Sequence, residues 1–498
     1  MKKTRIALAI TASMIAATPA MATNGDNLIG LGAQSRALGG TGVAAFYGSE
    51  NALANPALLA KAKGNEISFG GTLFKPSVKS GSNIQSNLNS NMGGYLQSGS
   101  VPNPPVNNSV VMHDSAADTN VIPEVSIVNP ISDNLSFGIG MFGSAGMGVD
   151  YSDYNDLFNA QSNLQIMKFA PSLSYKTKNF GFGFAPVLQY GALDINFRSQ
   201  VHDGQTSATD PNGQPVYLTS TTGTPTTGRQ NGNANTPAGS VTTFPMTVGS
   251  NGQPQPNSPL MQTVGSGVTS DLGWGYNAGA YMDMGNLTVG LAYQSAIDMK
   301  YKGQISTAGK AFGLNFSDNL EQPAELSLGL AYKMGKITLT GDYKQIKWSE
   351  AKGYKDFKWD DQTVIALGAK YQGKGFWLGA GYNKADNPIK DLNNTPAANT
   401  QAAQMQAYAN GATNMFNNLF FPATVESHIT FGGGYSLSKT VSIDAAVVMA
   451  SENKTSVDTS AVSSAFFTDY TGKQAGIPST STTKHSQIGY TVSVRYDF

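Results

Sequence analysis

The 498-residue chain contains no cysteine, which excludes a disulfide framework and metal sites built from thiolates. Charged residues are scarce as well, since Asp, Glu, Lys and Arg make up 13% of the chain, about half of their usual share. The 32 basic and 32 acidic residues cancel, so there is no basic excess that would indicate binding to nucleic acid.

Long apolar runs are also missing. Beyond the N-terminus we find no stretch of about 18 consecutive apolar residues, the length that a membrane-spanning helix requires. A chain of this kind can enter a membrane only as a closed β-barrel, because hydrocarbon leaves the backbone groups of an open sheet edge unpaired.

The first residues have the pattern of a secretory signal. Three basic residues within the first five positions precede an apolar run at residues 6–17, which is too short to span a bilayer. An Ala-Met-Ala cleavage site ends at Ala22. The pattern predicts a signal peptide at residues 1–22 and an exported mature chain. A buried N-terminal helix is the alternative.

At the carboxyl end, apolar and polar residues alternate, and a period of two places each set on one face of a β-strand. The apolar set is Ile488, Tyr490, Val492, Val494, Tyr496 and Phe498. The same alternation recurs, often ending in Tyr, near residues 287–293, 326–332, 337–343, 365–371, 376–382, 429–435 and 441–447. In a barrel the apolar face meets lipid between aromatic girdles, whereas in a soluble sandwich it forms the core.

Short and long connections follow one another in strict alternation. The short turns lie near residues 130–134, 177–179, 285–286, 334–335, 373–375 and 438–439. The long polar connections lie near residues 79–120, 148–163, 199–266, 303–322, 351–361, 385–423 and 455–481. A soluble sandwich has no reason to sort its loops in this way. We therefore predict an all-β, transmembrane antiparallel β-barrel of about 14 strands over residues 64–498, with 199–266 as a long external loop.

Residues 23–63 do not alternate and are rich in glycine. A segment of this length ahead of the first strand can enter the barrel. Because a large barrel leaks unless something fills it, we predict that residues 23–63 form an N-terminal hatch that plugs the lumen.

Several motifs in order resemble the FadL/TodX family of outer-membrane long-chain fatty acid and hydrocarbon transporters. They are Gly39-Gly-Thr-Gly-Val-Ala44, Asn55-Pro56-Ala57, Gln322-Pro-Ala-Glu-Leu-Ser-Leu-Gly-Leu-Ala-Tyr332, Asp342-Tyr343, Trp348-Ser349 and Gly432-Gly-Gly-Tyr-Ser436. The resemblance spans the whole mature chain and implies a passive transporter without cofactors.

The resemblance also implies a route for the ligand. A long-chain fatty acid would be held in the lumen and released sideways through a kinked third strand at Leu135–Met147, with Gly143 and Gly146 at the gate. Asn55, Pro56 and Ala57 are the expected hatch residues. Glycine permits a bend in a strand, although it also relieves crowding inside a barrel. The alternatives are an aromatic hydrocarbon channel of the same fold and a general porin.

Two cations are candidate partners for a fatty acid carboxylate. A bulge at Gly191 would turn Arg198 inward, and Arg198 falls near a ligand-cation position of the family. Lys358 shares the parity of the inward-facing Ala366 and resembles the family's other cation. The alternative is that both are solvated charges on the rim.

Apolar residues with inward parity are anomalous in a water-filled porin but are expected along the path of a hydrophobic ligand. We predict that Phe142, Ile346, Val364 and Trp377 contact the substrate. Packing of these side chains against the hatch is the alternative.

We find no nucleophile–base spacing, phosphate loop or metal motif, so we expect neither an enzyme nor a cofactor or metal site. An enzymatic barrel and an adhesin are weaker alternatives. The expected location is the outer membrane of a Gram-negative cell. The expected partners are a hydrophobic ligand, outer-membrane lipid and lipopolysaccharide, and the barrel assembly machinery, and the protein is expected to be a monomer.

Overall fold

The computed structural model describes residues 24–84, 86–87, 109–200, 261–265, 267–465 and 476–498, together with short strands between residues 217 and 255. The predicted signal peptide at residues 1–22 lies outside the described residues, as does most of the predicted loop at 199–266.

The wall of the molecule is a closed antiparallel barrel. Fourteen of the sixteen strands of the main sheet pair in sequence, and the last pairs with the first, so the predicted strand number and closure are confirmed. The wall strands are β1 (Glu66–Ser82), β3 (Asn120–Pro130), β4 (Leu135–Asp150), β5 (Gln161–Lys176), β6 (Phe180–Gln200), β13 (Thr269–Met284), β14 (Leu287–Gln294), β15 (Glu325–Met334), β16 (Ile337–Ile346), β17 (Gln362–Gln372), β18 (Phe376–Ala385), β19 (Ser427–Ser436), β20 (Val441–Asp458) and β21 (Thr480–Asp497).

Short additional strands lie at the loop end. In the main sheet, β2 (His113–Asp114) pairs with β1 and β12 (Met261–Val264) pairs with β6. Two small sheets are built from β7 (Tyr217–Thr219), β8 (Thr226–Gly228), β9 (Phe244–Pro245), β10 (Thr247–Val248) and β11 (Pro254–Gln255).

The two faces of the wall differ as the period of two predicts. On β15, Leu326 and Leu328 are about half exposed at 50% and 47%, whereas the intervening Ser327 is 3% exposed. Tyr332, near the end of the same strand, is exposed as a girdle residue would be. The apolar rows therefore point outward, as expected for a barrel in lipid, and do not pack together in a soluble core.

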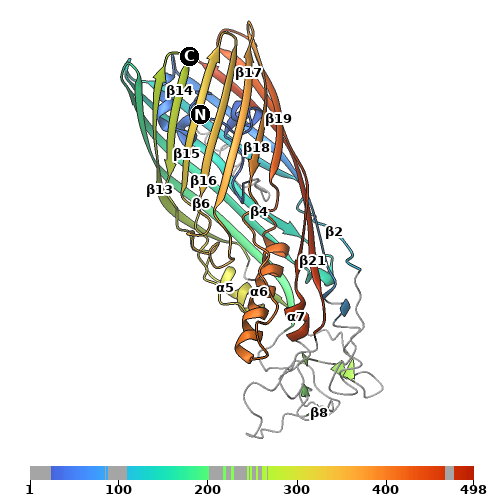
Figure 1. The fold of residues 1–498 in the computed structure, drawn as a ribbon. Coiled ribbons are helices and arrows are strands. Elements are labelled where there is room, and N and C mark those ends of the chain that lie inside the picture. The colour runs from blue at the N-terminus through green and yellow to red at the C-terminus, as the bar shows by residue number, and fades with distance from the viewer. Residues whose placement is uncertain are drawn as a thin grey trace, which may run out of the picture.

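The connections are sorted between the two ends of the barrel (Figure 1). The short turns lie at one end, and the helices of the long connections lie at the other: η2 (Asn155–Leu157), α5 (Ile305–Ala311), α6 (Gln401–Phe420) and α7 (Ser460–Ala465). None of the helices in the described ranges is long and apolar enough to cross a membrane.

The N-terminal region, coloured blue in Figure 1, lies inside the barrel near the end with the short turns. It contains α2 (Gly32–Ala37), α3 (Asn51–Ala54) and the 3-10 helix η1 (Pro56–Lys61). Asn55 caps η1 by accepting a hydrogen bond of 3.1 Å from the amide of Ala57, and Pro56 occupies the first helical position. Most residues between 24 and 62 are buried. We refer to residues 24–63 as the hatch.

The outward orientation of the apolar rows can be tested with a matched pair of substitutions. Leu330→Arg, in the middle of the lipid-facing row of β15, is expected to lower the free energy of unfolding by about 2–4 kcal/mol. Leu437→Arg, in the short turn after β19, is expected to cost no more than about 1 kcal/mol. Denaturant unfolding in phospholipid vesicles measures both, and equal costs would contradict a lipid-facing wall.

Candidate functional site

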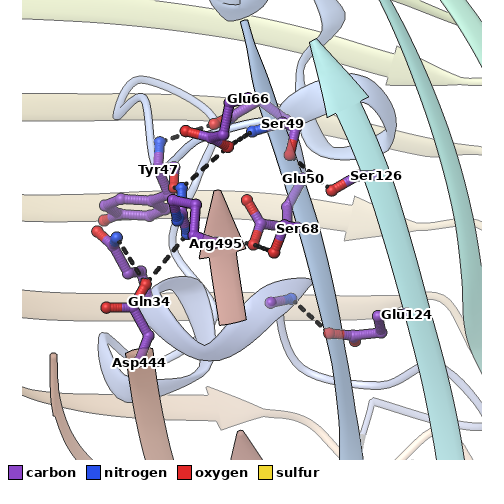
Figure 2. Close-up of polar contacts among 12 residues, drawn as sticks. Gln34, Tyr47, Ser49, Glu50, Glu66, Ser68, Glu124, Ser126, Asp444 and Arg495 are labelled. Carbon is purple, nitrogen blue, oxygen red and sulfur yellow. Dashed lines mark hydrogen bonds and ion pairs between the residues drawn. The ribbon is translucent and has the colours of Figure 1, made fainter. Parts of the chain in front are cut away.

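A buried ionic network joins the hatch to the barrel (Figure 2). The guanidinium of Arg495 on β21 forms ion pairs with Glu50 of the hatch at 3.2 Å, Glu66 of β1 at 3.2 Å and Asp444 of β20 at 3.1 Å. It also donates a hydrogen bond of 2.5 Å to the carbonyl of Tyr47. We call these four charged residues the Arg495 network. Because all four side chains are buried, separating them would leave uncompensated charges, and the network holds the hatch in place.

A second buried ion pair secures the first hatch helix. Arg36 of α2 pairs with Glu124 of β3 and donates a hydrogen bond of 2.5 Å to the hydroxyl of Thr72 on β1. The amide of Gly32 donates to the same carboxylate at 3.1 Å. The hatch is therefore fixed by charge on the side of the barrel next to β3.

The predicted hatch residues lie where the hatch meets other strands. The amide group of Asn55 donates to the carbonyl of Ala280 on β13 at 3.2 Å. Pro56 begins η1, and the carbonyl of Ala57 accepts a hydrogen bond of 2.7 Å from Ser174 on β5. This motif thus anchors the hatch opposite the Arg495 network.

Toward the end with the long loops, the barrel is filled by aromatic side chains. They come from β6, the segment after α5, the β16–β17 connection and the end of α6, and we call them the aromatic cluster: Phe197, Phe312, Phe316, Trp348, Tyr354, Phe357, Trp359, Phe416, Phe420 and Phe421. Ring centroids lie 5.2 Å apart for Trp348 and Trp359 and 5.1 Å apart for Phe197 and Phe312. An interior of this kind favours an apolar ligand over water.

The predicted inward orientation of four apolar residues is confirmed. Phe142, Ile346 and Val364 are buried in the same apolar core as the aromatic cluster. Trp377 is also buried, but it packs on Ala37 of the hatch, and its indole nitrogen donates to Asp444 at 2.6 Å. Three of the four residues thus belong to one apolar core, whereas Trp377 lies beside the Arg495 network. Contact of these residues with substrate stays a prediction.

The expected bulge at Gly191 is wrong. The register of β6 with both β5 and β13 is unbroken through this position, and odd-numbered residues point inward from Gly181 to Phe197. Phe197 is therefore buried and Arg198 is exposed. The apolar parity changes because the strand leaves the lipid there, so its apolar side chains turn from the lipid face to the aromatic cluster. Arg198 does not point into the interior.

The expected inward position of Lys358 is also wrong. Lys358 precedes β17 and lies in the loop, where it adopts a positive φ of 63° and is exposed. Its neighbours Phe357 and Trp359 are the residues that enter the aromatic cluster. The two predicted cations are thus both exposed, as the rim alternative anticipated.

The third wall strand is irregular where the glycine pattern predicts a kink. Pairing between β3 and β4 stops at Glu124 and Phe142, and the register of β4 with β5 shifts between Gly143 and Ala145. Beyond this point β4 continues to Asp150, where the amide of Ala116 donates to its carbonyl at 2.8 Å. We call the stretch of β4 between Phe142 and Asp150, where pairing with β3 is interrupted, the window.

At the window, the first residues of the hatch take the place of β3 as the hydrogen-bonding partner of β4. The amide of Leu28 donates to the carbonyl of Ser144 at 3.1 Å, and the amide of Gly146 donates to the carbonyl of Asp26 at 3.0 Å. Asn27 and Ala145 form the bridge pair between these bonds. We call residues 24–28 the N-terminal segment. Two backbone hydrogen bonds thus attach this segment to the edge of β4.

The N-terminal segment also touches the aromatic cluster. The carboxylate of Asp26 accepts hydrogen bonds from Tyr354 and, at 2.8 Å, from Gln322. Gly25, with a φ of 68°, packs so closely on the indole of Trp348 that a side chain there would clash. Burial raises the pKa of the Asp26 carboxyl to about 6, while these hydrogen bonds and the charge of Lys168 lower it. The segment therefore connects the cluster to the window.

A small polar cavity of about 70 Å³ lies below the N-terminal segment. Its lining includes Leu28, Ser144, Lys168, Gln322, Glu325, Asp342 and Lys344. Lys168 is not among the site residues predicted from the sequence, although the sequence contains a signal for its inward position. It shares the inward parity of Leu164 and Ile166 on β5, so a charge at this position cannot face lipid.

Comparison with known proteins identifies the family. Residues 9–498 match the family described as outer membrane protein transport protein (OMPP1/FadL/TodX). The chain belongs to this family. Membership in the OMPP1/FadL/TodX family confirms the predicted resemblance and the outer-membrane location, and it agrees with the expectation that the protein is not an enzyme.

Individual relatives are more distant. The 47 kDa outer membrane protein of Pasteurella multocida is 25% identical over 243 residues, which cover 45% of this chain and 50% of that protein. The chain spans half or less of the length of the curated relatives it matches.

Two solved structures have the same fold. A FadL homologue of Pseudomonas aeruginosa has a TM-score of 0.59 and 16% identity, with 97% of this chain and 100% of that chain covered. The toluene transporter TodX of Pseudomonas putida has a TM-score of 0.56 and 19% identity, with 95% and 99% covered. The predicted barrel fold is thus confirmed.

The Arg495 network can be tested by removing its cation. Arg495→Met leaves three buried carboxylates without a cationic partner and is expected to weaken the attachment of the hatch to the barrel by about 3–5 kcal/mol. Ion conductance in planar bilayers and tryptic cleavage within the hatch should both increase. Lys439→Met, in an exposed turn, is the control and should change neither. Unchanged conductance and cleavage in Arg495→Met would show that the network does not retain the hatch.

Seating of the N-terminal segment is expected to depend on pH through Asp26. Because the pKa of Asp26 is raised to about 6 when seated, protonation favours the seated state. This stabilisation of the seated segment is fully present below pH 3.8 and is lost as the pH rises through 6. It amounts to at most about 3 kcal/mol. A spin label on Asn24→Cys should become more mobile from pH 5 to pH 7.5. Asp26→Asn should remove this dependence, and an identical pH profile in that variant would contradict the assignment.

Proposed function

We propose that the protein is a passive transporter that carries long-chain fatty acids through the outer membrane and releases them sideways through the window. The observation that carries this proposal is the interrupted pairing of β3 and β4 at a place where the N-terminal segment makes the backbone hydrogen bonds to β4 instead. The aromatic cluster lies on the other side of the same segment, so displacing one short stretch connects an apolar interior to the membrane.

A sideways route suits a hydrophobic ligand because the ligand avoids the periplasmic water. Each methylene group that passes from an apolar environment into water costs about 0.8 kcal/mol. An exit into the bilayer removes this cost for the whole chain, so no energy source is required. The hatch, held by the Arg495 network, blocks the axial route and argues against a general porin.

Aromatic hydrocarbons are the second candidate substrate. The rings of the aromatic cluster favour stacking with a flat apolar ligand. Solved structures with this fold include proteins named as the toluene transporter TodX and the CymD monoaromatic hydrocarbon channel.

The outer surface supports the remaining expected partners. The apolar rows suit membrane lipid and lipopolysaccharide, and the exposed apolar and aromatic row of β21 suits recognition by the barrel assembly machinery. We also propose that the protein is a monomer.

Locking the N-terminal segment to β4 tests the route. Asn27 and Ala145 form a bridge pair whose flanking hydrogen bonds mark a non-hydrogen-bonded position, where Cα atoms lie about 4.5 Å apart. This spacing suits a disulfide, and the native chain has no cysteine to interfere. The double variant Asn27→Cys/Ala145→Cys should lose at least about 90% of oleate uptake when oxidised and recover it when reduced.

The two single-cysteine variants are the matched controls and should transport oleate under both conditions. Normal oleate uptake by the oxidised double variant would exclude exit through the window. Measuring toluene in parallel separates the substrates, because uptake of toluene without oleate by the wild type would favour the hydrocarbon function.

A further inference from the structure

Lys168 is a buried cation without a bound partner. Its side chain is 8% exposed and lines the polar cavity below the N-terminal segment. Among the described residues, no hydrogen bond or ion pair reaches its ammonium group. A buried charge in this situation is costly unless something else compensates it, so the position requires an explanation.

Two further polar groups without partners adjoin Lys168. The hydroxyl of Ser144, at the register shift of β4, is buried and lines the same cavity. Gln189 on β6 is directly opposite Lys168 in the ladder, is fully buried, and has an unpartnered amide nitrogen and oxygen. An ammonium and a hydroxyl thus offer donors to the cavity from two adjacent strands, and the unpartnered amide of Gln189 lies next to Lys168 on a third.

The neighbouring charges have other partners. Lys344 pairs with Glu325 at 3.5 Å, and the carboxylate of Asp342 accepts hydrogen bonds from the amides of Gly42 at 2.8 Å and Val43 at 3.1 Å. Glu325 and Asp26 both interact electrostatically with Lys168, but Glu325 is paired with Lys344, and the hydrogen bonds of Asp26 go to Tyr354 and Gln322. Lys168 is therefore the cation of this cavity that is available to a ligand.

The position of Lys168 relates this site to the window. Lys168 is paired with Phe142, the last residue of β4 that is paired with β3, so its side chain lies at the edge where the window begins. Phe142 and Leu28 place apolar surface beside the polar donors. A ligand that fits this combination has a small anionic head and an apolar body.

We infer that Lys168, with Ser144, binds the carboxylate of an amphipathic ligand as it passes from the aromatic cluster to the window. One water needs about 10–15 Å³, so the cavity of about 70 Å³ has room for a carboxylate but not for an acyl chain. The chain of the ligand then lies along the apolar residues above. The inference rests on the proposed transport and names its substrate class as long-chain carboxylates.

Binding of oleate and of methyl oleate, which has the same chain without the charge, tests this site. Lys168→Met should weaken oleate binding to the purified protein by about tenfold to a hundredfold, the range for a hydrogen bond to a charged group. Methyl oleate binding should change less than about twofold. Lys168→Arg should restore oleate binding to within a few-fold of the wild type.

Lys370→Met is the matched control, because Lys370 is another inward lysine, bonded to Gln34 at 2.7 Å on the far side of the hatch. It should bind both probes as the wild type does. Wild-type oleate affinity in Lys168→Met, or equal loss of both probes, would overturn the site while leaving transport intact. A wild type that takes up neither probe would overturn the proposed function itself.

Discussion

Every backbone amide and carbonyl in the membrane must find a partner within the protein, because hydrocarbon offers none. This constraint explains why the chain closes its sheet and why the outward side chains are apolar. It also gives the window its significance. Where β4 leaves β3, the N-terminal segment takes over the pairing of Ser144 and Gly146. On the proposed route, displacing this segment would open the wall.

The strength of the attachments decides which part moves. The body of the hatch is held by Arg495 with three carboxylates and by Arg36 with Glu124, all buried. Breaking such pairs costs about 3–5 kcal/mol each. The N-terminal segment is attached to β4 by two backbone hydrogen bonds, each with a net value of about 0.5–1.5 kcal/mol, and to the aromatic cluster by the hydrogen bonds of Asp26. Because no ion pair holds it among the described residues, we propose that the segment, and not the body of the hatch, is the part that a ligand displaces.

The sequence predicts the wall well and the interior poorly, for physical reasons. Lipid imposes a period of two on every strand. The number of strands, the face on which each side chain lies and the end of the barrel at which each loop lies can therefore be derived from the alternation. Above the lipid the same period continues, but the apolar side chains face inward. At Gly191 this change of environment shifts the parity of the apolar residues as a bulge would. For this reason the sequence predicts an inward Arg198. The contact of Asp26 with Tyr354 joins residues 328 positions apart, and no local pattern predicts it.

The aromatic cluster and the Lys168 site favour different ligands, and a ligand on the proposed route meets the cluster first. The aromatic cluster accepts any apolar molecule, including a hydrocarbon, since it offers few polar groups to satisfy. At the edge of the window, an apolar ligand would leave the ammonium of Lys168 without a hydrogen-bond acceptor, whereas a carboxylate would supply one. On the proposed route, selectivity for a charged head would therefore arise at the exit, after the chain of the ligand has entered the interior. A site that rejects isosteres through an unpaired buried charge discriminates more sharply than an apolar pocket can.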